Sequence, residues 1–344
     1  MWNFKMKRLL LANFAECPEN LHFERAFVRS AAARGCKLDI IHDFEYHYDF
    51  LGALPPPGGK RFKYSGPASL AACAGAYSLL VLLDFPKRAR CAPAFLRLAR
   101  GKAEKKFFVA NHLLPMPGHN FTADLCRRLK ALAAVDAGCV LAFDDAGLWG
   151  ELGLSRGKLT GRGYSTDCEY YAPQNAAAGD YVVSAGSAGR DFAALAAGVK
   201  ACGLDLKIFS DAKEKAGAGA EFLPLAKNLH NLRAAAAGAR AVVIPVSDDH
   251  INSAAGNSIA FLSMALGRPV LTRRTPYMEQ FITDGKNGFL YKNLSAGSIA
   301  RGLRRIGALS PARQLALGKA ARSTILRSAS LDRFCAAFLK QHVK

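Results

Sequence analysis

The sequence predicts an α/β protein made of two doubly wound domains, each a parallel sheet with helices on both faces. The chain has 344 residues, about twice the length of an ordinary single domain. Short apolar runs alternate with helix-like stretches, which is typical of a parallel sheet covered by helices. This alternation is interrupted by a polar, glycine-containing stretch over residues 157–180 and then begins again.

The first series of apolar runs is almost continuous in its hydrophobicity, as expected for strands buried on both sides. The expected strands are Arg8–Ala12, Leu38–His42, Tyr77–Leu83, Lys106–Ala110 and Cys139–Phe143. Helices are expected over Phe23–Arg34, ending at Gly35, and over Ala94–Arg100. The stretch Leu51–Pro67 is rich in proline and glycine and is expected to be a loop.

The second series repeats the pattern with more helices. Its expected strands are Tyr181–Ala185, Leu206–Phe209, Ala241–Pro245, Pro269–Thr272 and Gly288–Tyr291. Its expected helices are Asp191–Ala201, Leu229–Ala237, Ser258–Leu266, Gly297–Arg305, Pro311–Arg327 and a tail from Leu331. We expect domains over residues 1–173 and 174–322, with a C-terminal helix over 323–344 that crosses back to the first domain. The carboxyl ends of the two sheets would face a central cleft, where such folds bind ligands.

The chain is strongly basic, with 47 lysine and arginine residues against 27 aspartate and glutamate residues and a formal net charge of +20. Such a field attracts polyanions, anionic lipids and phosphorylated substrates alike. The basic residues are scattered, and no zinc-finger spacing, stacking motif or basic helical arm accompanies them. A nucleic-acid partner is therefore not expected.

The cysteines and the apolar runs bear on the compartment. Nine cysteines are widely spaced without a Cys-x-x-Cys pair, which argues against a zinc cluster or a disulfide framework and favours a reducing environment. The N-terminal apolar run is too short for a secretory signal, and no stretch approaches the roughly 20 apolar residues that cross a bilayer. We expect a cytoplasmic protein, with peripheral contact to an anionic inner membrane face as a further expectation.

The most distinctive segment runs from Ala241 to Asn293 and reads AVVIPVSDDHINSAAGNSIAFLSMALGRPVLTRRTPYMEQFITDGKNGFLYKN. It resembles the retaining glycosyltransferases of the GT-B fold, the family 4 group (glycosyl transferases group 1), which includes sucrose, mannosyl and bacterial lipopolysaccharide transferases. The residues in the family register are Met264, Gly267, Pro269, Val270, Glu279, Asp284, Gly285, Asn287, Gly288 and Leu290. Gly163–Pro173 resembles the interdomain linker of that family, and Phe107–Pro115 stands where the family has a strand ending in a histidine.

The resemblance implies two Rossmann-like domains, with the acceptor on the first and a nucleotide-diphosphate sugar on the second. It implies a hexosyltransferase-like enzyme that transfers sugar with retention to a glycan or lipid-linked acceptor, with neither a metal nor another cofactor. The chain departs from the family at two positions where glutamates are usual: Ala254, near the sugar, and Leu262, at the ribose hydroxyls. One of two basic residues expected after the opening strand of the second domain is also absent, and Arg190 takes the other position.

Two glycine-containing turns are the candidate donor-binding elements. Gly186 and Gly189 lie between a strand and a helix, where the backbone can approach a ligand closely and Arg190 can bind a diphosphate. The alternative is a tight turn with Arg190 paired to an aspartate at the surface. Gly256, Asn257 and Ser258 precede an apolar helix whose free N–H groups can hold a phosphate. Asn257 or Ser258 is also a suitable N-cap, and the two roles are compatible.

Four further features each allow both a functional and a structural interpretation. His112 follows an expected strand, and the resemblance implies that it contacts the transferred sugar; a lone histidine there can also be structural. Leu262 lies in the ribose position but also shares a helix face with Ile259 and Leu266, as a core residue would. Glu279 precedes the Asp284 turn and can instead cap a helix. The run of potential ligands from His42 to Asp49 has no partner cluster, so no metal site is expected.

The sequence therefore predicts a glycosyltransferase that uses a nucleotide-diphosphate sugar. A non-catalytic protein of the same fold is the second hypothesis, favoured by the missing glutamates at Ala254 and Leu262. A nucleotide-sugar epimerase is the third, and the linker and the Met264–Val270 segment argue against it.

Overall fold

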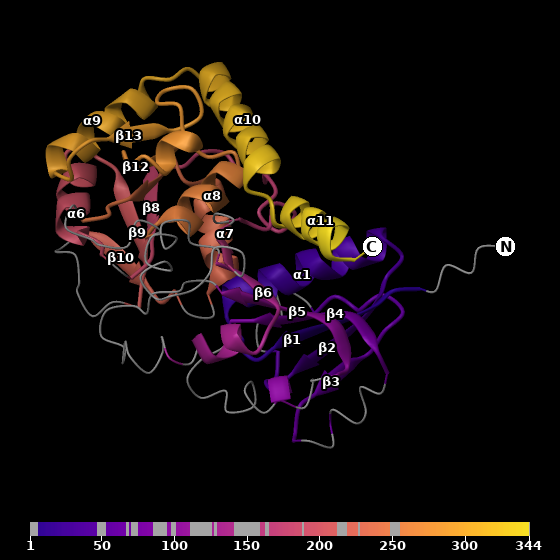
Figure 1. The fold of residues 1–344 in the computed structure, drawn as a ribbon. Helices are drawn as coiled ribbons and strands as arrows, with labels where there is room; N and C mark the ends of the chain where they lie inside the picture. Colours follow the sequence, from indigo (N-terminus) through magenta and orange to yellow (C-terminus); the bar gives the residue numbers. More distant parts are fainter. Residues whose placement is uncertain are drawn as a thin grey trace. The chain divides into compact units, whose positions relative to one another are not determined.

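The computed structural model describes residues 6–46, 53–66, 69, 75–84, 95–97, 101–110, 126, 129–140, 159–161, 165–187, 189–211, 219–225, 228–247 and 255–343 (Figure 1). The chain divides into two compact units. One comprises Met1–Tyr164 with Leu331–Lys344, and the other Ser165–Ser330. Each unit is built on its own parallel sheet.

The first unit has a seven-stranded sheet in the order β3-β2-β1-β4-β5-β6-β7. Its strands, all paired in parallel, are β1 (Arg8–Asn13), β2 (Lys37–His42), β3 (Arg61–Lys63), β4 (Tyr77–Leu83), β5 (Ala103–Ala110), β6 (Ala137–Val140) and β7 (Leu159–Gly161). The strand order reverses between β1 and β4, so the sheet is doubly wound, as the sequence predicts.

Helix α1 (Pro18–Ala33) begins five residues before the expected start because Pro18 occupies its first turn, where proline is favourable. Its predicted end at Gly35 is confirmed. Gly35 has a φ of +63°, and the N–H of Cys36 donates to the carbonyl of Ala31.

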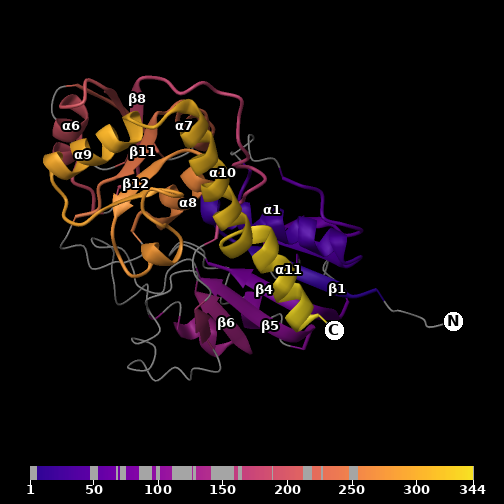
Figure 2. The same ribbon diagram turned by 90° about the horizontal axis from the view of Figure 1, so that it is seen from above.

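Helix α11 (Leu331–His342) belongs to the first unit and packs along α1 (Figure 2). Arg29 of α1 forms an ion pair with Asp332 at 2.7 Å. The ring of Phe338 lies 4.6 Å from that of Phe107 and 6.3 Å from that of Phe27, centroid to centroid. The last helix of the chain thus completes the core over the strands of the first sheet.

The second unit has a six-stranded parallel sheet in the order β10-β9-β8-β11-β12-β13. Its strands are β8 (Tyr181–Ala185), β9 (Asp205–Phe209), β10 (Ala220–Leu223), β11 (Ala241–Ile244), β12 (Val270–Arg273) and β13 (Phe289–Tyr291). Its helices are α6 (Phe192–Lys200), α7 (Leu229–Gly238), α8 (Asn257–Ala265), α9 (Ala296–Gly307) and α10 (Pro311–Ser328), with a 3-10 turn η2 (Met278–Gln280). This sheet is also doubly wound, with the reversal between β8 and β11.

Four of the five helices just named form two contacting pairs. α6 and α9 contact each other, and their side chains share one core with alternate strand residues such as Val182 and Val243. α8 contacts β11, β12 and α10. The approach of α8 to α10 is close because Gly267 faces Gly318: a Cβ on Gly318 would lie 2.2 Å from the carbonyl oxygen of Gly267.

The segment that follows Ser165 packs on the second unit. Thr166 forms a parallel bridge with Ser330, and its N–H donates to the carbonyl of Ala329. The guanidinium of Arg322 donates to the carbonyls of Cys168 and Tyr171. These bonds explain why the units divide before this segment and after Ser330, whereas the sequence suggests division near residues 173 and 322.

Among the described residues, β5 and β6 begin at Ala103 and Ala137, before the predicted starts at Lys106 and Cys139, and three strands lie where the sequence predicts none. β3 lies inside Leu51–Pro67, which we expected to be a loop, and neither β7 nor β10 was expected. β3 is a short edge strand with one apolar residue, Phe62, between two basic ones, which gives no run of apolar residues, and it is paired with β2. Among the described helices, none combines the length and the apolar character that crossing a membrane requires.

Candidate functional site

The turn after β8 is shaped by two glycines and one arginine. Gly186 and Gly189 have φ values of +108° and +59°, which residues with side chains rarely adopt. A Cβ on Gly186 would lie 2.5 Å from Nη2 of Arg190. Gly186 is therefore required both by the backbone conformation and by the space that the guanidinium occupies.

Arg190 is held between the ends of β8 and β11. Its Nε donates to the carbonyl of Ala185 at 3.3 Å, and its backbone forms an antiparallel bridge with Val246. The N–H of Asp191 donates to the carbonyl of Pro245, and the N–H of Ser247 donates to that of Gly189. The turn after β8 and the segment after β11 are thus joined into one structure at the carboxyl edge of the sheet.

Burial lowers the pKa of the Arg190 guanidinium to about 10, against an effect of the nearby Tyr291 that acts to raise it. The group still carries its positive charge at neutral pH. A partly desolvated cation attracts an anion more strongly than one in water does, because the local dielectric constant is lower.

Helix α8 begins beside this guanidinium. Its N-cap is Gly256, with a φ of +87°. A Cβ on Gly256 would lie 2.5 Å from Cγ2 of Ile244 and 3.5 Å from Nη2 of Arg190. The structure therefore brings three predicted residues together, Gly186, Arg190 and Gly256, although a long stretch of chain separates the two turns.

The N-termini of α6 and α8 are capped differently, and the cap of α8 is not the one that the sequence suggests. Asp191 caps α6, because its side chain accepts from the N–H of Ala194 at 2.8 Å. In α8 neither Asn257 nor Ser258 is the N-cap, because Gly256 takes that position and has no side chain with which to accept a hydrogen bond. The positive end of α8 is thus the better anion site of the two.

The remaining predicted residues of α8 lie inside the fold. Asn257 is buried and Ser258 half-buried. Leu262 is 4% exposed, and Ile259 and Leu266 are buried as well, which is the arrangement of a core-facing helix stripe. Ala254 lies outside the described residues. The contact of Leu262 with a ribose remains a prediction.

Glu279 is bound to a neighbouring cation. It lies in η2, and its Oε1 accepts from Nη1 of Arg274. The N-cap of η2 is Tyr277, and the N–H of Met278 donates to the hydroxyl of Thr275 at 3.1 Å. Glu279 therefore does not serve as the helix cap that its sequence position also allows, and its role toward a donor remains a prediction.

Arg273 is a residue of this edge that we did not anticipate. It ends β12, and its Nη1 donates to the carbonyl of Ser247 at 3.2 Å. The signal in the sequence is a pair of arginines, Arg273 and Arg274, directly after an apolar strand. The pairing of β12 with β11 brings the first of them to the segment that also binds Arg190.

The carboxyl edge of the first unit carries a buried polar network. Asn13 ends β1, and its Nδ2 donates to Glu24 at 3.0 Å. Nδ2 of Asn20 donates to Oδ1 of Asn13 at 3.0 Å and to the carbonyl of Asp84 at 2.7 Å. Glu24 also forms an ion pair with Arg61 at 2.7 Å. The network ties the ends of β1 and β4 to α1 at the point where the strand order reverses.

His112, the predicted sugar contact, lies outside the described residues. His42 is described: its Nδ1 lies 2.9 Å from the carbonyl oxygen of Phe44, and its ring packs on those of Phe44 and Tyr46. Burial lowers the pKa of His42, which favours the neutral imidazole at physiological pH. Among the described residues, no group of three histidine, cysteine, aspartate or glutamate side chains gathers as metal ligands would.

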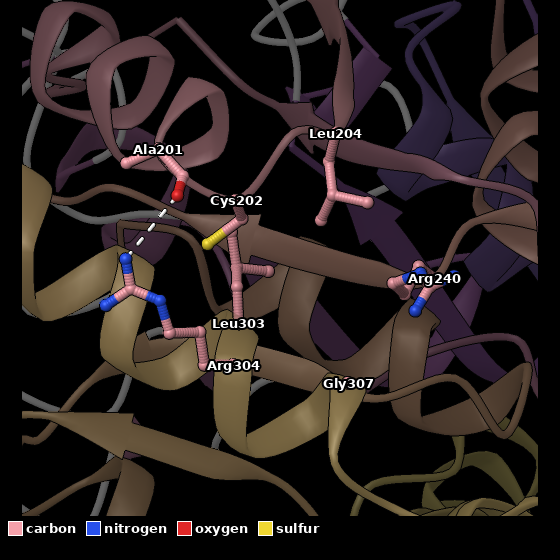
Figure 3. A pocket seen from close by; sticks show the side chains of 7 residues that line it. All are labelled: Ala201, Cys202, Leu204, Arg240, Leu303, Arg304 and Gly307. Atoms are coloured by element: carbon pink, nitrogen blue, oxygen red, sulfur yellow. Dashed lines mark hydrogen bonds between the residues drawn. The ribbon is translucent and has the colours of Figure 1, made fainter.

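A cavity of about 320 Å³ lies at the opposite, amino-terminal edge of the second sheet (Figure 3). Arg304 of α9 donates to the carbonyl of Ala201 at the end of α6, and Arg240 pairs with Asp180. Both arginines thus have local structural partners, and one of them satisfies a helix C-terminus. The residues predicted to bind the donor lie at the other end of the strands.

No model of a protein family matches the sequence, and no curated protein does. Solved structures of glycosyltransferases do match the fold. Sucrose-phosphate synthase from Thermosynechococcus elongatus matches with a TM-score of 0.63 over 98% of both chains at 15% identity. HepE of Anabaena, solved with UDP and glucose, matches with a TM-score of 0.67 over 98% of both chains at 11% identity. The chain has the GT-B fold.

TarM provides a further GT-B match, with a TM-score of 0.68 over 99% of both chains at 9% identity. A variant of TarM from S. aureus was solved with UDP, fondaparinux and alpha-GlcNAc-glycerol. At these identities the likeness concerns the fold. The prediction of two Rossmann-like, doubly wound sheets is confirmed by the strand orders and by these matches.

Proposed function

We propose that this GT-B protein is a glycosyltransferase of the hexosyltransferase kind, which moves a sugar from a nucleotide-diphosphate donor to a glycan or lipid-linked acceptor with retention. The observation that carries the proposal is the position of Arg190. Its guanidinium lies against Gly186 and Gly256, beside the start of α8 and at the carboxyl edge of the sheet. A cation, a glycine turn and a helix N-terminus together form a site suited to a diphosphate.

In the proposed reaction, negative charge develops on the diphosphate as the bond to the sugar breaks. The guanidinium of Arg190 and the N–H groups of the first turn of α8 stabilise that charge without a metal. Ser258 contributes its hydroxyl, and His112 orients the sugar. The first unit binds the acceptor, and the buried network around Asn13 holds its carboxyl edge in shape.

The same proposal assigns the chain to the cytoplasm, in peripheral contact with the anionic inner face of a membrane. The formal net charge of +20 supports that contact.

Calorimetry with UDP, GDP and ADP tests donor binding, and incubation with the matching nucleotide sugar and a panel of acceptors tests transfer. We expect one nucleoside diphosphate to bind the wild-type chain, Arg190→Ala to weaken that binding at least about tenfold, and the product to retain the anomeric configuration of the donor. A wild-type chain that binds none of the three would contradict the proposal.

A non-catalytic GT-B binding protein is the second candidate. The observation that favours it is Leu262, a buried leucine where the resembling family carries a glutamate. It predicts nucleotide binding without turnover of any donor, whereas the first candidate predicts both.

A further inference from the structure

The outer face of helix α10 carries two exposed leucines. Among the described residues, three large hydrophobic side chains are exposed, and two of them belong to this helix: Leu315 is 60% exposed and Leu326 42%. The two leucines are eleven residues apart, which is about three helical turns, so they lie on one line along the helix. A single exposed leucine is ordinary on a protein surface. Two on the same line of one helix form an apolar stripe.

The same face carries positive charge that no carboxylate compensates. Lys319 lies on the line between the two leucines, Arg313 and Arg327 flank it, and all three are exposed. In the part of the chain that the structure describes, neither Arg313 nor Lys319 forms an ion pair, and the guanidinium of Arg327 donates to the hydroxyl of Ser323 within the same helix. A hydroxyl does not neutralise a cation, so all three charges are open to an anionic ligand.

The opposite face of α10 belongs to the fold. It is buried through Leu317, Ala321 and Ile325, and the helix contacts α8. The fourth cation of the helix, Arg322, donates to the carbonyl of Ala265 at 2.6 Å as well as to the two carbonyls of the segment after Ser165. Its charge is therefore used inside the unit, in contrast to the three cations of the outer face.

Acidic residues are absent from the sequence around this helix. From Gly285 to Leu331 the chain contains no aspartate or glutamate. The two acids that flank this stretch are already paired, Asp284 with Arg305 at 3.1 Å and Asp332 with Arg29 at 2.7 Å. The field around the outer face of α10 is therefore positive. The basic residues of the stretch are Lys286, Lys292, Arg301, Arg304, Arg305, Arg313, Lys319, Arg322 and Arg327.

Leucines and cations on one face select the chemistry of the occupant. A second copy of this chain is disfavoured, because two such faces repel each other. A nucleic acid would pair with the cations, but α10 has no aromatic side chain on which a base could stack. An anionic lipid surface matches both features: its headgroups pair with the cations, and the leucines enter the apolar boundary beneath the headgroups. The long lysine and arginine side chains reach up to the headgroups.

We propose that the outer face of α10 is a docking surface for an anionic lipid bilayer. Leu315 and Leu326 enter the boundary between headgroups and acyl chains, and Arg313, Lys319 and Arg327 pair with the lipid phosphates. This inference rests on the membrane contact of the proposed function and deepens it by naming the surface that makes the contact. It does not depend on the donor site.

Cosedimentation with vesicles tests the cations. Vesicles of phosphatidylcholine alone are compared with vesicles of equal parts of phosphatidylcholine and phosphatidylglycerol, over a range of salt concentrations. We expect the wild type to bind only the anionic vesicles, and less tightly as the salt concentration rises. The triple variant Arg313→Gln/Lys319→Gln/Arg327→Gln should lose about tenfold or more in affinity, because each cation near an anionic surface contributes about fivefold.

The matched control removes three exposed lysines from other elements, in the variant Lys105→Gln/Lys200→Gln/Lys340→Gln. It has the same net charge as the first triple variant. We expect its affinity for the anionic vesicles to stay within about threefold of the wild type, because charges beyond a Debye length from the docked surface are screened.

The leucines are tested by Leu315→Gln/Leu326→Gln. Both side chains are exposed, so the variant should keep the melting temperature of the wild type while losing about tenfold or more in vesicle affinity. Met6→Gln is the matched control, since Met6 is 65% exposed and lies outside α10. If the glutamines lower the melting temperature, Leu315→Ala/Leu326→Ala provides the second variant, because alanine favours the helix.

The failures are distinguishable. A wild-type chain that binds neither kind of vesicle overturns the membrane contact and this inference with it, whereas calorimetry with UDP, GDP and ADP on the same preparation tests the donor site separately. Equal losses in the two triple variants, or an unchanged affinity of the leucine variant, overturn the role of α10 alone. Salt-sensitive binding of single-stranded RNA that the α10 triple variant loses, without vesicle binding, would assign the face to nucleic acid instead.

Discussion

Arg190 and Gly256 lie against each other: a Cβ on Gly256 would stand 3.5 Å from Nη2 of the arginine. The contact joins the turn after β8 to the start of α8. It requires a residue without a side chain, because the same Cβ would lie 2.5 Å from Cγ2 of Ile244. The glycine thus allows the helix N-terminus and the guanidinium to share one site.

Gly256→Ala should therefore affect both stability and binding. Its positive φ alone costs about 1–3 kcal/mol for a residue with a side chain, and the clash with Ile244 adds to that cost. We expect a lower melting temperature and weaker binding of the nucleoside diphosphate that binds the wild type. Gly203→Ala is the matched control, since Gly203 has a φ of +65° with no atom within 4 Å of its Cβ position. Equal losses of stability in the two variants would contradict the clash.

Removal of the Phe338 ring should destabilise the first unit. Phe338 is 4% exposed and packs on Phe107 and Phe27. We expect Phe338→Ala to lower the free energy of unfolding of this unit by about 3–5 kcal/mol, measured by denaturant unfolding with limited proteolysis to identify the unit that opens. Lys340→Ala, an exposed change on the same helix, should have little effect. Opening of the second unit first in Phe338→Ala would show that α11 does not support the first sheet.

The strands that the sequence predicts with correct bounds are the apolar ones. Tyr77–Leu83 and Tyr181–Ala185 agree residue for residue with β4 and β8, because a strand buried on both sides is almost entirely apolar. β3 was missed because Arg61–Lys63 is only three residues long and two of them are basic. It is specified by the register with β2 and by the ion pair of Arg61 with Glu24, and both depend on distant residues.

The residues of the candidate site also include some that the sequence predicts and some that it does not. Gly186, Arg190 and Gly256 are recognisable as residues with special backbone or charge requirements. Their mutual contact depends on the pairing of β8 with β11, which no local pattern reveals. Arg273 was missed because its place beside Ser247 follows from the pairing of β11 with β12.

The charge of Arg190 should lower the stability of the empty protein. Burial lowers its pKa to about 10 in the folded state, so the folded chain binds this proton more weakly than the unfolded chain does. The resulting loss of stability applies in full below pH 10 and is relieved as the pH rises above 10 toward the higher pKa of the unfolded chain. Replacing a desolvated charge with an apolar side chain of similar length is often neutral or stabilising.

We therefore expect Arg190→Met to unfold at a denaturant concentration equal to or above that of the wild type at pH 7. The free energy of unfolding of the wild type minus that of the variant should be constant from pH 7 to about 9.5 and should rise between about pH 10 and 11. The stabilisation by nucleoside diphosphate should be lost in the variant. A pH-independent difference throughout would show that the proton affinity of Arg190 is the same in both states.

Leu262→Glu tests whether a ribose pocket exists beside α8. Leu262 is 4% exposed, so a glutamate confined there without a partner would be desolvated, and we expect the free energy of unfolding to fall by about 3–5 kcal/mol. Leu315→Glu on α10 is the matched control, because Leu315 is 60% exposed and the same change there should cost little.

Thermal melts of Leu262→Glu with and without UDP, GDP and ADP then separate the two functional candidates. If a ribose lies against this part of the helix, the new carboxylate pairs with its hydroxyls, and the nucleotide raises the melting temperature of Leu262→Glu by more than that of the wild type. If the position is purely core, the variant melts early and gains nothing extra from any nucleotide, a result that would favour the non-catalytic protein over the transferase.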